Sequence, residues 1–430
     1  MTKIYSKTIL ENGLNVLLKE IHTAPLVSSW IWYRVGSRDE ITGHTGISHW
    51  CEHMQFKGTP KFPSNLLERA VARDGGMWNA FTYFDWTTFF ETMPADKIDL
   101  GLRIEADRMI NSVFDEKEIA SERTVVISER EGSENDPSFL LGEAVQNAAF
   151  RTHPYHHEII GDLPDLKSMS RDDLYNHYRT FYAPNNAILS VAGDFKTTEM
   201  LANIRDIYGK IPMGAAPPRI TRPEPAAIGE HRLTVEGPGE TTYLDISYHA
   251  PAANDLEFFP VTVLDSLLAG PSSLNMFGGG GTSNKTSRLY RALVEKELAV
   301  SVGGGLAATA DPFLYSVVIT LNPKRKPEEA LAAFDVEIKR LQDEFIPLNE
   351  ITRAIKQARA LFAYGSENIT NQAFWLGHAE MFAGYDWFLT YLDKLAKVTP
   401  AELQKIARKY FRPQNRVVGT YIPRGEEVRV

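Results

Sequence analysis

The stretch from residue 170 to residue 191 reads SRDDLYNHYRTFYAPNNAILSV, and a related stretch, TPAELQKIARKYFRPQNRVVGTY, occupies residues 399 to 421. Each begins with a hydroxyl side chain that is followed three residues later by an acid, the capping box that starts a helix. Each continues through a Pro-x-Asn turn into an apolar strand. The two stretches align without a gap at an offset of 229 residues, from 170 to 399. This repeat predicts a duplication, with two similar halves that each combine helices and a sheet.

The connector between the two halves is also visible in the sequence. Residues 213–230 are rich in proline and lack apolar periodicity, which is typical of an extended linker. We therefore predict an N-terminal domain over residues 1–212 and a C-terminal domain over residues 231–430. The predicted fold class is α+β, with each half a mostly antiparallel sheet covered by helices.

Composition and charge exclude several classes of protein. The 46 basic and 55 acidic residues give a net charge of −9, which argues against nucleic acid as a partner. The single cysteine, Cys51, excludes a disulfide scaffold and a metal site built from cysteines. No apolar run approaches the roughly 18–20 residues that span a bilayer, so no membrane span is predicted.

A helix predicted around residues 46 to 57 carries the chemistry. Thr45 or Ser48 would cap its start. Residues 49–53 read HWCEH, so that His49 and His53 are four residues apart and share one face of the helix. Both imidazoles can therefore reach a single ion.

Two neutral imidazoles suit Zn²⁺, which takes a third protein ligand and leaves one position for water in catalytic sites. Glu52 lies next to the same ion without being forced to ligate it. The alternative is an exposed histidine pair beside a solvated Glu52. Trp50 argues against exposure, and a buried, unpaired glutamate would be costly. Metal binding is therefore the favoured interpretation.

A second predicted helix, which begins near residue 115, offers further acids. Glu122 and Glu129 are seven positions apart and stand about 20° from each other around the helix. Val125 and Val126 flank them, which predicts a buried stripe in which a cation would partner the carboxylates. The alternative is that both acids face solvent and form pairs along the helix.

These motifs together resemble the pitrilysin/insulinase family of zinc peptidases, the inverzincins with an H-x-x-E-H motif. The resemblance lies in GISHWCEHMQFKGT at residues 46–59, GMWNAFT at 76–82, ERTVVISE at 122–129, HPY at 153–155 and YAPNNA at 182–187. It covers nearly the whole chain. Within the family, it is strongest to the zinc-bearing subunits of mitochondrial processing peptidase and similar bacterial heterodimers.

The resemblance implies a role for each matched residue. His49, His53 and Glu129 would ligate one zinc ion per chain, and Glu52 would be the general base. Glu122 would orient the site without ligating the metal. The substrate would add to an edge strand formed by Asn79, Ala80, Phe81 and Thr82.

The resemblance also implies a shape and a substrate class. Such a chain would face a homologous chain across an enclosed chamber, like the two halves of a clamshell, so that only small, unfolded peptides reach the zinc. The implied activity is that of a zinc metalloendopeptidase.

The sequence departs from the family in its second half. Members that act alone carry an Arg and a Tyr there, seven residues apart, which reach the zinc site. In this chain the Arg position is Val294 and the Tyr position is Val300, with one residue missing between them. The missing pair predicts a partner, a homologous subunit that lacks the zinc motif and supplies both side chains.

Two alternatives to this heterodimer stay open at the level of sequence. One is a non-catalytic structural or assembly subunit of the same fold. The other is a self-sufficient homodimeric peptidase that uses Tyr290 or Arg291. Residues 1–7 lack the apolar segment of a signal peptide, which predicts the cytoplasm. Similarity to exported bacterial relatives would instead place a chain with its signal removed in the periplasm.

Overall fold

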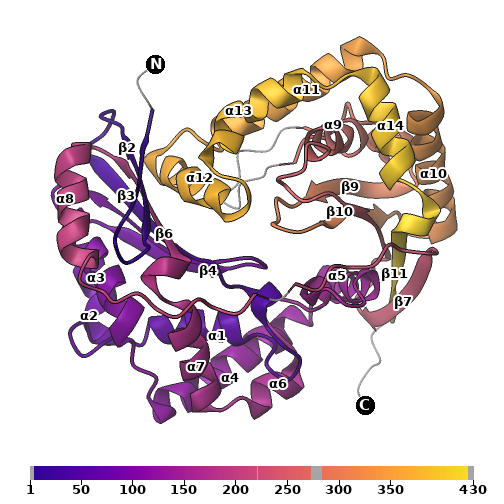
Figure 1. The fold of residues 1–430 in the computed structure, drawn as a ribbon. Coiled ribbons are helices and arrows are strands. Elements are labelled where there is room, and N and C mark those ends of the chain that lie inside the picture. The colour runs from indigo at the N-terminus through magenta and orange to yellow at the C-terminus, as the bar shows by residue number, and fades with distance from the viewer. Residues whose placement is uncertain (1–3, 220, 273–282, 425–430) are drawn as a thin grey trace. The chain divides into compact units, whose positions relative to one another are not determined.

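The computed structural model describes residues 4–219, 221–272 and 283–424 (Figure 1). The chain forms two compact units, each built around one sheet. Unit 1 joins Met1–Arg130, His157–Arg222 and Ser366–Tyr385, and unit 2 joins Glu131–His156, Pro223–Gly365 and Asp386–Val430. The predicted α+β class, with two sheets and covering helices, is confirmed.

The sheet of unit 1 has six strands in the order β1-β2-β6-β3-β5-β4. Their bounds are β1 Ser6–Ile9, β2 Asn15–Glu20, β6 Ala187–Gly193, β3 Leu26–Tyr33, β5 Thr87–Pro94 and β4 Met77–Thr82. Only β2 and β6 run parallel, and the other neighbours are antiparallel. Strand β4 therefore lies at one edge of the sheet.

The sheet of unit 2 repeats this arrangement, but the described residues include no counterpart of β1. Its order is β7-β11-β8-β10-β9. The bounds are β7 His231–Pro238, β11 Arg416–Arg424, β8 Tyr243–Ala250, β10 Phe313–Leu321 and β9 Ala299–Leu306. Strand β11 is parallel to β7 and antiparallel to β8, just as β6 is parallel to β2 and antiparallel to β3. The repeated sequence stretches thus end in equivalent strands.

The helices cover the faces of the two sheets. In unit 1 they are α1 Ile47–Gln55, α2 Ser64–Arg73, α3 Ile98–Asn111, α6 Leu163–Ser168, α7 Arg171–Phe181, α8 Thr197–Tyr208 and α12 Ile369–Phe382, with most of α4 Glu116–Ser133. Unit 2 holds α5 Pro137–Ala149, α9 Phe258–Leu268, α10 Pro327–Asp343, α11 Leu348–Tyr364, α14 Pro400–Tyr410 and nearly all of α13 Tyr385–Ala396. Both predicted capping boxes form, at the starts of α7 and α14.

The units are not contiguous in sequence, unlike the predicted domains 1–212 and 231–430. Helix α12 comes from the C-terminal half but packs on β3 and β6 of unit 1, where Phe374 contacts the rings of Trp30 and Trp32. Helix α5 comes from the N-terminal half but packs on β11, β7 and β8 of unit 2. Each sheet thus buries one face under a helix from the other half of the sequence.

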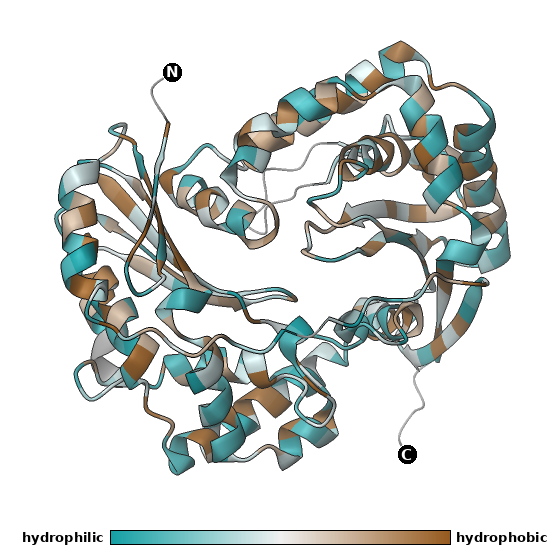
Figure 2. Cartoon of the chain, in the orientation of Figure 1, coloured by the Kyte–Doolittle hydropathy of each residue, from teal (hydrophilic) through white to brown (hydrophobic). Residues whose placement is uncertain are grey.

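Hydropathy follows these packing roles. All eleven residues of α9 are buried, whereas α11 shows hydrophobic and hydrophilic residues in turn along its length (Figure 2). This alternation is what a helix with one buried face requires. Among the described helices, none has both the length and the apolar character that crossing a membrane requires. Between α8 and β7 the described residues form no helix or strand.

Candidate metal centre

Two histidines of helix α1 point to the same side of the helix. The Nε2 atoms of His49 and His53 lie 3.2 Å apart. On the opposite side, Trp50 and Cys51 are buried in the core of unit 1, and the Cys51 thiol donates to the carbonyl oxygen of Leu174 at 3.3 Å. This packing sets the rotation of α1, so that both imidazoles face away from the core.

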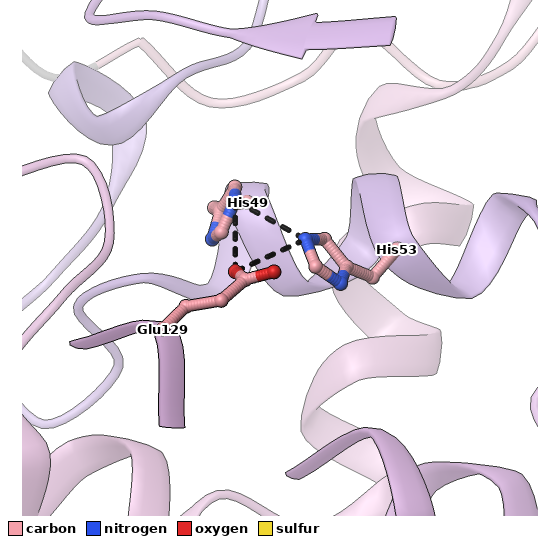
Figure 3. A group of neighbouring side chains, drawn as sticks. All are labelled: His49, His53 and Glu129. Atoms are coloured by element: carbon pink, nitrogen blue, oxygen red, sulfur yellow. Dashed lines mark hydrogen bonds and ion pairs between the residues drawn. The ribbon is translucent and has the colours of Figure 1, made fainter. Parts of the chain in front are cut away.

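Helix α4 brings a carboxylate to the two rings (Figure 3). Oε2 of Glu129 lies 3.6 Å from Nε2 of His53 and 4.0 Å from Nε2 of His49. Each of the three residues offers a ligand atom, and these atoms all lie within 4.8 Å of one another. Four ligands placed tetrahedrally at about 2.0–2.1 Å from zinc stand about 3.3–3.4 Å apart. The observed spacings are therefore close to those of a zinc site with one position left open.

Glu122 holds His53 from the side away from Glu129. Its Oε1 lies 2.9 Å from Nδ1 of His53, and its other oxygen forms an ion pair with Lys57. Burial would raise the pKa of Glu122, but the hydrogen bonds to His53 and Lys57 outweigh burial and lower it. The resulting carboxylate fixes the His53 ring with Nε2 toward the candidate metal position.

The two imidazoles differ in their electrostatics. Burial, with a smaller contribution from neighbouring His53, lowers the pKa of His49 to about 3, so that this ring is neutral and able to ligate. Burial would lower the pKa of His53 as well, but the hydrogen bond to Glu122 and the charge of Glu129 outweigh it and raise that pKa. A metal ion must therefore compete with a proton at His53.

Glu52 lies beside the candidate metal position on the same helix. Its Oε2 accepts a hydrogen bond of 2.6 Å from the hydroxyl of Thr82, which is the last residue of β4. Burial raises the pKa of Glu52 to about 7, despite the opposing effect of this hydrogen bond. A carboxylate with a pKa near neutrality is suited to taking up and returning a proton.

The buried stripe of α4 is narrower than the sequence predicted. Val126 is fully buried, but Val125 is 41% exposed, so the expectation that two valines flank the acids in a buried stripe is wrong for Val125. The buried residues of α4 are Ile119, Glu122, Val126 and Arg130, spaced by three or four residues. Glu129 lies at the margin of this stripe with 44% of its side chain exposed, which leaves its carboxylate accessible.

Strand β4 presents an open edge next to Glu52. Among the described residues β4 pairs only with β5, as the predicted edge strand of Asn79 to Thr82 requires. The amide of Tyr83 donates to the carbonyl of Trp86, and hydrogen-bonded pairs recur at every second residue of an antiparallel ladder. The backbone amides and carbonyls of Ala80 and Thr82 therefore point to the open side. The side chain of Asn79 instead accepts from the amide of Ala80 at 2.9 Å.

The start of α1 is capped by a residue that sequence reasoning missed. The prediction of Thr45 or Ser48 as the cap is wrong, because the N-cap is Gly46 and no side-chain cap bond forms there. The carboxylate of Glu40 instead accepts from the amides of Gly46 and Ser48, both at 2.8 Å. Glu40 lies outside any periodic pattern, and its only sequence signal is an acid shortly before a helix.

The second unit places the two departures from the family pattern on adjacent elements. Val294 ends a short π-helix, Tyr290–Val294, and Val300 lies on the edge strand β9 with 57% of its surface exposed. Arg288 is paired with Glu350 at 3.1 Å. Neither valine side chain can donate a hydrogen bond.

Comparison with solved structures supports this fold. A protease from Helicobacter pylori superposes with a TM-score of 0.90 at 24% identity, over 97% of this chain and 99% of the other. A protein from Pseudomonas fluorescens, described as a peptidase M16 inactive domain, superposes with a TM-score of 0.85 at 17% identity, over 99% of this chain and 98% of the other.

Sequence comparison identifies proteins related to this chain. Over 96% of its length the chain is 25% identical to an uncharacterized zinc protease of Streptomyces coelicolor, of which 89% is covered. Over 69% of its length it is 26% identical to a probable mitochondrial-processing peptidase subunit beta of Arabidopsis thaliana, of which 55% is covered. Residues 15–163 match the family described as insulinase (peptidase family M16), and residues 168–358 match the peptidase M16 inactive domain. The chain therefore belongs to the pitrilysin/insulinase family of zinc peptidases.

Proposed function

We propose that this chain is the zinc-bearing subunit of a two-chain endopeptidase that hydrolyses small, unfolded peptides. The observation that carries the proposal is the convergence of His49, His53 and Glu129, whose ligand atoms lie within 4.8 Å of one another. Glu52 lies on the same helix as the two histidines. Three protein ligands leave one position for a water molecule, as in catalytic rather than structural zinc sites. The relatives named zinc proteases support the same reading.

Each residue of the site has a distinct task in this proposal. His49, His53 and Glu129 would hold the zinc, which would supply Lewis-acid activation of water and of the scissile carbonyl. Glu52 takes the proton of the attacking water and returns it to the leaving amine. Because the hydroxyl of Thr82 donates to Oε2 of Glu52, we assign the proton to Oε1.

The peptide is held as an added strand on β4. The outward amide of Thr82 and the outward carbonyls of Ala80 and Thr82 bond to an extended backbone, which gives affinity without strong dependence on peptide sequence. Thr82 also contacts Glu52, so a peptide on this edge lies next to the general base. Most of the backbone of a folded protein is already hydrogen-bonded within its own helices and sheets, so unfolded peptides are the favoured substrates.

The partner subunit supplies what Val294 and Val300 cannot. A hydrogen-bond donor aimed at the developing oxyanion contributes about 3–4 kcal/mol to catalysis where it has been removed by mutation. We therefore expect the isolated chain to bind zinc but to hydrolyse peptides very slowly. A homologous chain with an Arg and a Tyr at these positions restores the rate.

The test is a peptidase assay of the purified chain, alone and mixed with a homologous chain that lacks the zinc motif and carries the Arg and Tyr, together with measurement of bound zinc. We expect one zinc per chain in both samples and rapid cleavage only in the mixture. Glu52→Gln is the matched control, because it removes the base and keeps every proposed ligand. The mixture containing this variant should bind zinc and stay inactive.

Two results would contradict parts of the proposal. Rapid cleavage by the isolated chain, at the rate of the mixture, would favour a self-sufficient homodimer and refute the need for a partner. Stoichiometric zinc without cleavage, in every mixture of chains, would favour a non-catalytic assembly subunit.

A further inference from the structure

The N-terminal end of α1 is held by a carboxylate that does not touch the metal centre. The side chain of Glu40 is fully buried. Its Oε1 accepts from the amide of Ser48 at 2.8 Å, and its Oε2 accepts from the amide of Gly46 at 2.8 Å. Nε2 of His157 lies 2.9 Å from the same Oε2. All three contacts are within ordinary hydrogen-bond distance.

We propose that Glu40 is a positioning residue of the metal centre, which fixes the first turn of α1 so that His49 stays in register with His53 and Glu129. This inference rests on the proposed zinc function. It concerns how the chain keeps its ligands in place, and it assigns Glu40 no contact with metal or substrate.

Among the residues that the structure describes, no other side chain caps the first turn of α1. The first four amides of a helix lack partners within the helix and need acceptors from elsewhere. The N-cap residue Gly46 has no side chain that could accept from these amides, and its backbone is in the left-handed region with φ of 83°. Glu40 satisfies two of these amides and also places a negative charge at the positive end of the helix. Without it, the turn that carries His49 would fray first.

The two histidines are held in different ways, and only the position of His49 depends on the first turn of α1. The ring of His53 is fixed directly, because Nδ1 lies 2.9 Å from Glu122. Nδ1 of His49 is buried and finds no hydrogen-bond partner among the described residues. The position of the His49 ring therefore depends on its backbone. Ser48, whose amide Glu40 holds, is the residue immediately before it.

The surroundings of Glu40 leave the helix start little room to move. A Cβ placed on Gly46 would lie 2.4 Å from the carbonyl oxygen of Ile160, so the backbones are in close contact at this point. His157 belongs to the same segment as Ile160 and is also buried. Glu40 thus joins the start of α1 to this segment at a point of tight packing.

The test compares Glu40→Gln with a matched control, Asp165→Asn. Asp165 accepts from the amide and hydroxyl of Thr45, at 3.0 and 2.8 Å, so it anchors the loop before α1 without touching the helix amides. The amide group of the glutamine would face a backbone donor, whereas the asparagine disturbs only the loop. We would measure zinc affinity by competition with a chelator, the visible spectrum of the Co²⁺-substituted protein, and the thermal midpoint of the apoprotein.

We expect Glu40→Gln to weaken zinc binding by about fivefold or more, the factor that corresponds to loss of a typical helix cap, and to change the Co²⁺ spectrum. Asp165→Asn should lower the thermal midpoint and leave both metal readouts unchanged. Equal zinc affinity and an unchanged spectrum in folded Glu40→Gln would overturn the proposal. So would an equal loss of zinc affinity in Asp165→Asn, because the effect would then be one of general stability.

Glu40→Asp keeps the charge but shortens the side chain, and it serves if Glu40→Gln does not fold. A folded Glu40→Asp protein with the wild-type spectrum and affinity would also overturn the proposal. If the wild-type chain itself bound no zinc, the proposed function would fail, and this outcome is distinct from a failure of the Glu40 assignment alone.

Discussion

Replacing Glu122 with glutamine should weaken zinc binding by about tenfold. Only 8% of the Glu122 side chain is exposed. Its carboxylate contacts Nδ1 of His53 at 2.9 Å and the ammonium group of Lys57. Loss of such an outer partner costs about 10- to 100-fold in metal affinity, or about 1.4–2.7 kcal/mol. Glutamine keeps an oxygen that can accept from His53 but loses the charge, so we expect the lower end of this range. Glu122→Leu removes the acceptor as well and should approach 100-fold.

The assay is a competition titration against a coloured zinc chelator at constant pH and ionic strength. Glu118→Gln is the matched control, because Glu118 lies on the same helix and its carboxylate is 4.0 Å from Nζ of the same Lys57. Its side chain is half-exposed, and an exposed pair contributes only about 0–1 kcal/mol. The control should therefore bind zinc within about threefold of wild type. The reasoning would be refuted if Glu122→Gln bound zinc as wild type does, or if Glu118→Gln lost as much affinity.

Three further predictions address the base, the helix anchor and the core. Thr82→Val removes the hydroxyl that orients Glu52. It should lower kcat by about fivefold with little change in KM or zinc affinity, since one hydrogen bond contributes about 1 kcal/mol. Thr82→Ser should restore kcat, and equal rates for both variants would count against the assignment. Burial would lower the pKa of His157, but its hydrogen bond to Glu40 outweighs burial and raises that pKa. Protonated His157 therefore stabilises the fold fully below the unfolded pKa of about 6.5, and this stabilisation is lost as pH rises through the folded pKa. Urea unfolding of the apoprotein should show wild type losing its advantage over His157→Gln between pH 6 and pH 9, and a constant difference would contradict this. Arg108 is buried between Glu91 and Glu105, and burial raises the pKa of Glu91 well above its usual value, so the ion pair of this cluster is Arg108–Glu105. Arg108→Met leaves the buried Glu105 carboxylate without its cation and should cost about 3–5 kcal/mol of unfolding free energy. A change below about 1 kcal/mol in the same urea experiment would show that Glu105 is not charged.

Short-range spacing explains what the sequence predicts well. The histidine pair needs only the geometry of one helix turn, and the structure brings both Nε2 atoms within 3.2 Å. The capping boxes at Ser170 and Thr399 are likewise local, and both form. The duplication is visible because the strands that end the repeated stretches, β6 and β11, keep equivalent neighbours.

Contacts between distant segments explain what the sequence does not predict. The cap on α1 comes from Glu40, six residues before Gly46, and depends on how a non-periodic loop folds back over the helix. The exposure of Val125 depends on which side of α4 meets its neighbours, and seven-residue spacing alone cannot distinguish the two flanks of Glu122 and Glu129. The ion pair of Lys57 with Glu122 cannot be predicted from the sequence, because Glu122 lies on α4, far from Lys57 along the chain.

Because α5 and α12 each pack on the sheet of the other half of the sequence, the two halves cannot be expressed as separate stable fragments. A gene cut within residues 213–230 would yield an N-terminal fragment whose sheet lacks α12, so that Trp30 and Trp32 would be exposed to water. The C-terminal fragment would lack α5, whose Leu141 and Val145 lie against Gly419 of β11. Expressed separately, both fragments would expose apolar aromatic or aliphatic surfaces and aggregate, whereas co-expression would let them reassemble. Each half of the sequence is thus incomplete without the other, because each supplies the helix that covers one face of the other half's sheet.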